Sequence, residues 1–251
     1  MTPQLSGVWA KFDRACEHYG AFEGLLADWF AANGPDMRNA VEDDRWHVYR
    51  WVVRHQPDLD EFAVVAADMF HNLRAALDYL VYQLVLGTGS LPTARNSFPC
   101  VRDAIDWSST AGDRLKGLSD DDKDKIKGLQ PFDPDYSGPA DHHTLVLLDT
   151  LNNFYKHRLL PLAVMSVTKL GLTHTFDEGS PEAECECHFT DRPIADGAEF
   201  YRFRFTPDIP YRVHVGEPPE LRVWFDDSNL AHRWNFADMI EWVRRAIVIF
   251  E

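Results

Sequence analysis

A long apolar segment, residues 58–86, carries charged and amide side chains inside a helical pattern. Within it the stretch DMFHNLRAALD places His71, Arg74 and Asp78 three or four residues apart, so all three share one helix face. The segment is apolar nearly all round, which predicts a buried central helix. A charge on a buried helix is costly unless it is paired. We therefore expect a second polar element to face these side chains.

The run NNFYKHR is the candidate for that second element, because it ends an apolar helix predicted over residues 140–158. Each polar cluster needs hydrogen-bond partners that the other can supply. We predict that the two helices pack against each other. The side chains expected near their crossing are Arg74, Asp78, Lys156 and His157.

The remaining pattern predicts an α+β fold, with a helical bundle, a C-terminal antiparallel sheet and a closing C-terminal helix. Helices are predicted over 3–33, 58–86, 101–107, 120–128, 140–158 and 229–250. Strands are predicted over 45–55, 162–176, 183–189, 199–205 and 221–225. The helical part thus covers about 1–160 and the β-rich part about 161–226. We expect strand 45–55 to join the later sheet, making residues 1–251 a single domain.

Composition excludes several function classes. The formal net charge is -15, which opposes general nucleic-acid binding because that depends on Lys and Arg neutralising phosphates. No apolar run reaches the ~18 residues of a membrane span, and the N-terminus does not resemble a secretory signal. The four cysteines, scattered along the chain, favour a reduced, cytoplasmic protein. The sequence predicts no membrane partner and no cofactor.

The face that carries His71, Arg74 and Asp78 has two interpretations. As a functional pocket, the histidine would transfer protons, the arginine would bind an anion and the carboxylate would orient one of them. As a structural feature, it would be a buried ion pair, with Asp78 holding Arg74 or reaching Arg158.

The second cluster also has two interpretations. Lys156 and Arg158 would bind an anion together with Arg74 and Asn72. Alternatively, the cations after the helix would only complement the negative end of its dipole.

A metal site is a weaker alternative. Asp68 and His71 could combine with His142, His143 and Asp149 as carboxylate and histidine ligands in a bundle. Nearby arginine and lysine side chains would compete for the same space, so we predict no metal.

The runs FHNLRAALDYLVYQL, SFP, QPF and YKHRLL resemble a shared pattern in a group of bacterial proteins of actinobacterial type. That pattern is HNLR-x-ALDHL, then FP, then DKHR-x-L, and the similarity covers about residues 58–160. Tyr79 stands where histidine is usual, and Tyr155 stands where aspartate precedes KHR. The group has no established activity, so the resemblance implies no catalytic role for these residues.

A looser resemblance is to the HEPN superfamily, helical-bundle proteins of which many are metal-independent ribonucleases. Their motif is an arginine, four to six intervening residues and then a histidine. Arg50 and His55 have this spacing, but they lie in the strand predicted over 45–55. His71, Asn72 and Arg74 are similar residue types in the reverse order.

Two functions remain open. The first is a non-catalytic binding or interaction module that has a polar pocket between two core helices and takes a small anionic ligand. Its partner could be a second copy of the chain, in a homodimer. The second is a HEPN-like phosphodiesterase or ribonuclease that would use His71, His157, Arg74 and Lys156. The sequence has no Gly-rich phosphate loop, nucleophile elbow or zinc-protease helix. We therefore favour the binding module.

Overall fold

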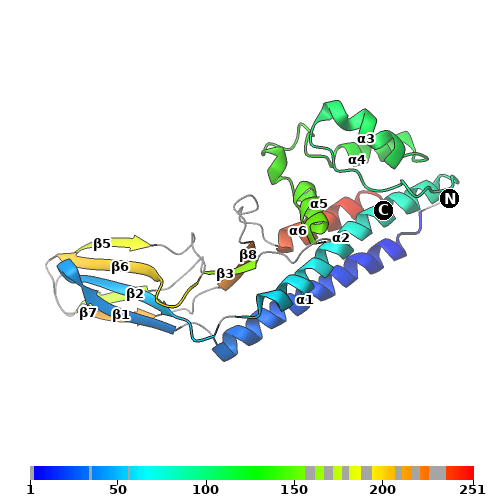
Figure 1. Cartoon of the computed structure of the whole chain (residues 1–251). Helices are drawn as coiled ribbons and strands as arrows, with labels where there is room; N and C mark the ends of the chain where they lie inside the picture. The colour runs from blue at the N-terminus through cyan, green and yellow to red at the C-terminus, as the bar shows by residue number, and fades with distance from the viewer. Residues whose placement is uncertain are drawn as a thin grey trace. The chain divides into compact units, whose positions relative to one another are not determined.

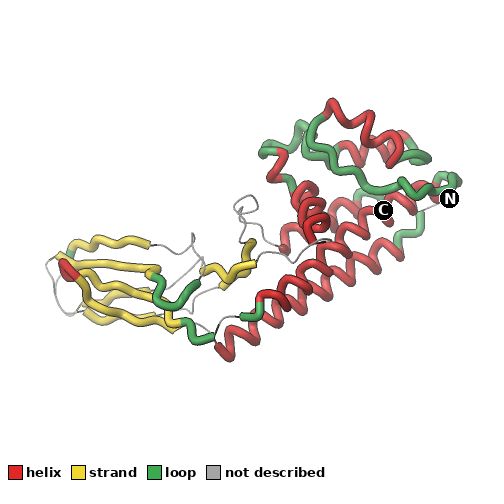
Figure 2. Tube along the Cα trace, in the orientation of Figure 1, coloured by secondary structure: helices red, strands yellow, loops and turns green. Residues whose placement is uncertain are grey.

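The computed structural model (Figures 1 and 2) describes residues 3–33, 36–55, 57–155, 162–166, 172–176, 181–187, 194–206, 211–215, 221–225 and 236–251. The fold class is α+β, as predicted, with a four-stranded antiparallel sheet and a C-terminal helix. The chain divides into two compact units. The helical unit comprises Met1–Gly24, Asp60–Leu160 and His232–Glu251, and the β unit comprises Leu25–Leu59 and Pro161–Ala231.

Two long antiparallel helices, α1 (Ser6–Asn33) and α2 (Leu59–Gly87), form the base of the helical unit (Figure 1). Phe22 of α1 packs edge-on against Phe62, near the start of α2. At the other end, Gly7 of α1 lies against the Tyr79 ring of α2, because a Cβ atom added at Gly7 would be 3.6 Å from that ring. Most of α2 is buried, with Phe70 fully inaccessible, but the helix is not buried nearly all round as predicted. Val64, His71 and Tyr82 are exposed along one face. In the described residues no helix is long and apolar enough to cross a membrane.

The shorter helices of the helical unit begin at identifiable capping side chains. Ser119 accepts a hydrogen bond from the Asp122 backbone N–H at 3.1 Å and caps α4 (Asp120–Lys127), as the sequence predicted. The helix predicted over 101–107 was misplaced. A 3-10 turn, Ala104–Asp106, leads into α3 (Trp107–Arg114), because the Asp103 carboxylate accepts from the Ile105 N–H and starts the turn there.

Helix α5 (Thr144–Tyr155) begins later than predicted. A 3-10 turn, Ala140–His142, precedes it, and the His143 Nδ1 accepts from the Leu145 N–H at 3.2 Å. The closing helix α6 spans Phe236–Val248. The predicted start of that helix, at residue 229, lies outside the described residues.

The main sheet of the β unit has the strand order β1-β2-β6-β5. Its strands are β1 (Asp36–Glu42), β2 (Trp46–Val52), β6 (Glu199–Thr206) and β5 (Glu182–Cys187). The antiparallel pairing of β2 with β6 confirms that the early strand joins the later sheet. The sequence did not predict β1, because its exposed stretch DMRNAVE lacks an alternating apolar pattern.

Two strand pairs complete the β unit: β3 (Leu162–Ser166) with β8 (Leu221–Phe225), and β4 (Leu172–Phe176) with β7 (Tyr211–Val215). The single strand predicted over 162–176 is therefore two strands, and β7 was missed. His174 of β4 and Tyr211 of β7 pack their rings on Phe203 of β6. This aromatic cluster joins the β4–β7 pair to the main sheet.

Candidate functional site

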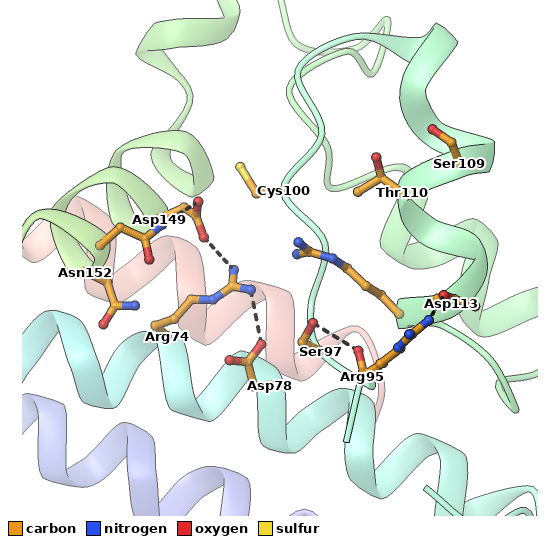
Figure 3. Close-up of a pocket in the computed structure, with 12 residues that line it drawn as sticks. Arg74, Asp78, Arg95, Ser97, Cys100, Ser109, Thr110, Asp113, Asp149 and Asn152 are labelled. Atoms are coloured by element: carbon orange, nitrogen blue, oxygen red, sulfur yellow. Dashed lines mark hydrogen bonds and ion pairs between the residues drawn. The ribbon is translucent and has the colours of Figure 1, made fainter. Parts of the chain in front are cut away.

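A pocket of about 640 Å³ opens in the helical unit (Figure 3). This volume lies within the range of about 300–1,000 Å³ that is usual for small-molecule sites. Helices α2, α3 and α5 and the loop between α2 and α3 contribute its walls. The lining residues are Arg74, Asp78, Arg95, Ser97, Cys100, Ser109, Thr110, Asp113, Arg114, Asp149, Asn152 and Asn153.

Arg74 is the most buried charged group of the pocket, with a side chain only 8% exposed. Its Nη2 donates to Asp78 Oδ1 at 3.2 Å and to the backbone carbonyl of Phe98. Its Nη1 lies 3.7 Å from Asp149 Oδ1, too far for a hydrogen bond, and has no acceptor among the described residues. A buried N–H donor without an acceptor is costly and rare, so this atom has capacity for water or a ligand.

Asp78 completes a closed set of hydrogen bonds with Arg74 and the Phe98 backbone. Its Oδ1 accepts from the Phe98 N–H at 2.9 Å, while Arg74 donates to the Phe98 carbonyl. Both polar backbone groups of Phe98 are therefore satisfied by one turn of α2. Burial raises the pKa of Asp78, and the nearby Arg74 charge and the Phe98 N–H oppose that rise.

Gln130 fixes the following part of the same loop. Its side chain is fully buried, with Oε1 accepting from the Val101 N–H and Nε2 donating to the Ile126 carbonyl, each at 3.0 Å. The SFP and QPF motifs thus have a structural explanation. The first hydrogen-bonds to the HNLRAALD helix and the second anchors Val101, and together they hold Cys100 at the pocket.

Arg114 supplies a second cation at the end of α3. Its backbone carbonyl accepts from Asn96 Nδ2 at 3.0 Å and from the Ser97 N–H at 3.4 Å, so the loop fixes its position. Its half-buried side chain makes no ion pair or hydrogen bond within the described part of the chain. The third cation, Arg95, is exposed and pairs with Asp113 at 2.5 Å.

Cys100 is the one thiol in the pocket lining. Burial, reinforced by the Asp149 charge, raises its pKa to about 11, against the opposing effect of Arg74. The nucleophilic form of cysteine is the thiolate, so at neutral pH this group is an inert thiol.

Of the two polar clusters predicted from sequence, the described members Arg74, Asp78, Asn152 and Asn153 line one pocket. His71, expected to be buried, is exposed and does not line it, because its position on α2 turns it toward the helix surface. Asn72 is buried, but its Nδ2 donates to the Asp68 carbonyl one turn earlier at 2.8 Å. Lys156, His157 and Arg158 lie outside the described residues.

Helices α2 and α5 do approach each other, through two side-chain interactions. Asp149 of α5 faces Arg74, and Asn152 Oδ1 lies 3.4 Å from His71 Nδ1. Sequence reasoning missed the α3 wall, Ser109, Thr110 and Arg114, because this short polar helix has no apolar period. From the sequence, Asp149 was proposed only as a metal ligand.

His143, another residue of the proposed metal alternative, serves the α5 cap instead. It is buried between the rings of Tyr136 and Trp242, and burial lowers its pKa to about 4. Across the described ranges, no group of three or more His, Cys, Asp or Glu is placed to hold a metal ion.

No family profile, curated protein or solved structure matches this chain.

Proposed function

We propose that the chain is a non-catalytic binding module whose pocket takes a small ligand with an anionic group, a carboxylate or a phosphate. The observation that carries this proposal is the buried guanidinium of Arg74, whose Nη1 has no hydrogen-bond acceptor in the described structure. A charged donor in a partly desolvated site gives a stronger hydrogen bond to an anion than the same donor in water.

Arg114 supports the same ligand chemistry. It lines the pocket and forms no ion pair with a described residue, so its charge is available to a ligand. The Thr110 hydroxyl adds a neutral donor, while the hydroxyls of Ser97 and Ser109 donate to backbone carbonyls and offer acceptors. The lining is made of polar and charged side chains, which suits a charged ligand rather than an apolar one.

The lining favours binding over catalysis. Among the described residues it contains no histidine, and its one cysteine is held as a thiol. The phosphodiesterase alternative assigns proton transfer to His71, which is exposed outside the lining, and to His157, which lies outside the described residues. The support for that alternative is therefore the smaller of the two.

A thermal-shift titration with inorganic phosphate and with sulfate tests the proposal, against sodium chloride at the same ionic strength. A ligand at ten times its Kd stabilises the folded state by about 1.4 kcal/mol. We expect this protection in the wild type and its loss in Arg114→Gln, whose side chain has no structural partner to lose. The matched control is Arg102→Gln, which removes an equal charge from an exposed pair with Asp141, outside the lining.

Two results would contradict the proposal. If neither phosphate nor sulfate stabilises the wild type more than chloride does, the pocket does not bind the expected class of ligand. Equal protection of Arg114→Gln would contradict the assignment of Arg114 to the anion site. Incubation with a short single-stranded RNA separates the alternative, since metal-independent cleavage that is lost in His157→Ala would support the phosphodiesterase.

A further inference from the structure

We propose that the ligand of this pocket is a zwitterion, a small molecule that carries a protonated amine close to its carboxylate or phosphate. This inference rests on the proposed function, because it assigns the ligand of the same pocket. It starts from the charges of the lining, where three arginines stand with three aspartates, so that their formal charges cancel. A plain anion that binds Arg74 Nη1 would compete with Asp149 for this cation and leave the Asp149 carboxylate uncompensated.

Asp149 is the carboxylate best placed to receive a cation. Its Oδ2 accepts from Asn153 Nδ2 at 3.2 Å, and its Oδ1 has only the long 3.7 Å ion pair with Arg74 Nη1 and accepts no hydrogen bond from a described residue. Its side chain is 34% exposed, toward the pocket that it lines. The other two pocket carboxylates are already engaged, Asp78 by Arg74 and Phe98 and Asp113 by Arg95.

The donor and the acceptor that lack a hydrogen bond face each other across one long ion pair. Arg74 Nη1 and Asp149 Oδ1 are 3.7 Å apart, too far to satisfy each other and close enough for adjacent groups of one ligand to reach both. An anion accepting from Arg74 Nη1 would place a neighbouring ammonium within reach of Asp149. Figure 3 shows Asp149 on the opposite side of the pocket from Ser109 and Thr110 of α3.

The rest of the lining suits a polar remainder of the ligand. Thr110 and Asn152 offer both donors and acceptors, and the hydroxyl oxygens of Ser97 and Ser109 offer acceptors. The pocket volume of about 640 Å³ exceeds what a charged headgroup fills, so it has room for such a remainder. The shared chemistry, an amine beside an anion, occurs in amino acids and in aminoalkyl phosphates.

Isothermal titration calorimetry of the full chain at pH 7.5 and fixed ionic strength tests this inference with matched probes. L-2-Aminobutyrate is the zwitterion, butyrate has the anion alone, and L-2-aminobutyramide has the cation alone. Phosphoethanolamine and ethyl phosphate repeat the comparison for a phosphate. We expect each zwitterion to bind about five- to tenfold more tightly than its anion-only match, from one added partly exposed ion pair.

The isosteric variant Asp149→Asn should remove that preference and leave butyrate bound as tightly as before, or more tightly. The matched control, Asp141→Asn, removes a carboxylate outside the lining and should keep the preference. Each preference is a ratio within one variant, so differences in stability between variants do not affect it.

The outcomes separate the two proposals. Butyrate binding as tightly as aminobutyrate, and ethyl phosphate as tightly as phosphoethanolamine, would overturn the zwitterion and leave the anion pocket standing. A loss of butyrate binding equal to that of aminobutyrate in Asp149→Asn would show that Asp149 only positions Arg74, and would also overturn it. Binding by none of the anionic probes would overturn both proposals.

Discussion

The two units use the same type of ion pair in different surroundings. In the helical unit, the Arg74 side chain is only 8% exposed. It pairs at 3.2 Å with Asp78, whose side chain is 36% exposed, and it donates to the Phe98 carbonyl. In the β unit, Arg204 pairs with Glu184 at 2.6 Å across two strands, with side chains 35% and 61% exposed. We expect the shorter pair to contribute less to stability, because water competes for two exposed charges and reaches the buried guanidinium of Arg74 much less. Distance alone therefore does not rank these interactions.

Breaking the buried pair should have the largest effect. Asp78→Ala removes the main partner of Arg74 and the acceptor of the Phe98 N–H, and we expect it to lower the free energy of unfolding by about 3 kcal/mol. This is the low end of the range for a broken buried pair, since Asp149 stays near Arg74. Urea unfolding followed by circular dichroism measures the change. A loss below about 0.5 kcal/mol would place this pair with the exposed pairs of the sheet.

Gln130 tests whether neutral buried groups of the helical unit matter in the same way. Gln130→Leu leaves the buried Val101 N–H without its acceptor, and we expect a loss of about 2 kcal/mol. The same unfolding measurement applies. An unchanged midpoint would mean that water replaces the side chain and that the loop does not depend on this anchor.

One histidine in each unit, His143 and His174, should make the free energy of unfolding depend on pH. His143 has its pKa lowered by burial to about 4, whereas in the unfolded chain the ordinary value is 6.5. Below pH 6.5 the unfolded chain takes up a proton that the folded state refuses until about pH 4. Stability from this group is thus complete above pH 6.5 and falls by about 1.4 kcal/mol for each pH unit through that window.

His143→Asn keeps an acceptor for the Leu145 N–H and removes the titration. The stability of this variant should depend less steeply on pH between 6.5 and 4 than that of the wild type. Equal slopes would show that other groups dominate acid unfolding. His174 of the β unit, whose pKa burial and His47 also lower, is less enclosed, and His174→Asn should flatten the profile less.

Breaking the exposed pair should have the smallest effect. Arg204→Ala removes the pair with Glu184 and the contact of its guanidinium with the Trp46 ring, and we expect a loss below about 1 kcal/mol. The thermal midpoint in low and high salt measures it, and the loss should shrink in high salt. A loss as large as that of Asp78→Ala would erase the distinction between the two regions.

Features that depend on residue spacing within one element were predicted well from the sequence. The position of α2, the Arg74–Asp78 pair four residues apart and the Ser119 cap are all local patterns. That the early strand joins the later sheet was predicted from its aromatic and β-branched content, but its particular partner, β6, was not.

The sequence could not predict features that depend on contacts between distant backbone groups. Phe98 is held through its backbone N–H and carbonyl, and because every non-proline residue has these groups, the sequence does not indicate their partners. Arg114 belongs to a short polar helix without an apolar period, and β1 is exposed along almost its whole length. The α3 wall of the pocket was therefore missed even though the motif that fixes the adjoining loop was recognised.

The most direct measurement is a titration of phosphate into chain labelled with 15N at arginine side chains and backbone amides, followed by NMR. We predict that the Nε signals of Arg74 and Arg114 and the amide of Phe98 shift together along one saturating curve. The Nε signal of Arg204 in the β unit should shift no more than it does in chloride. Unchanged Arg74 and Arg114 signals, or an equal response of Arg204, would contradict a specific anion site in the helical unit.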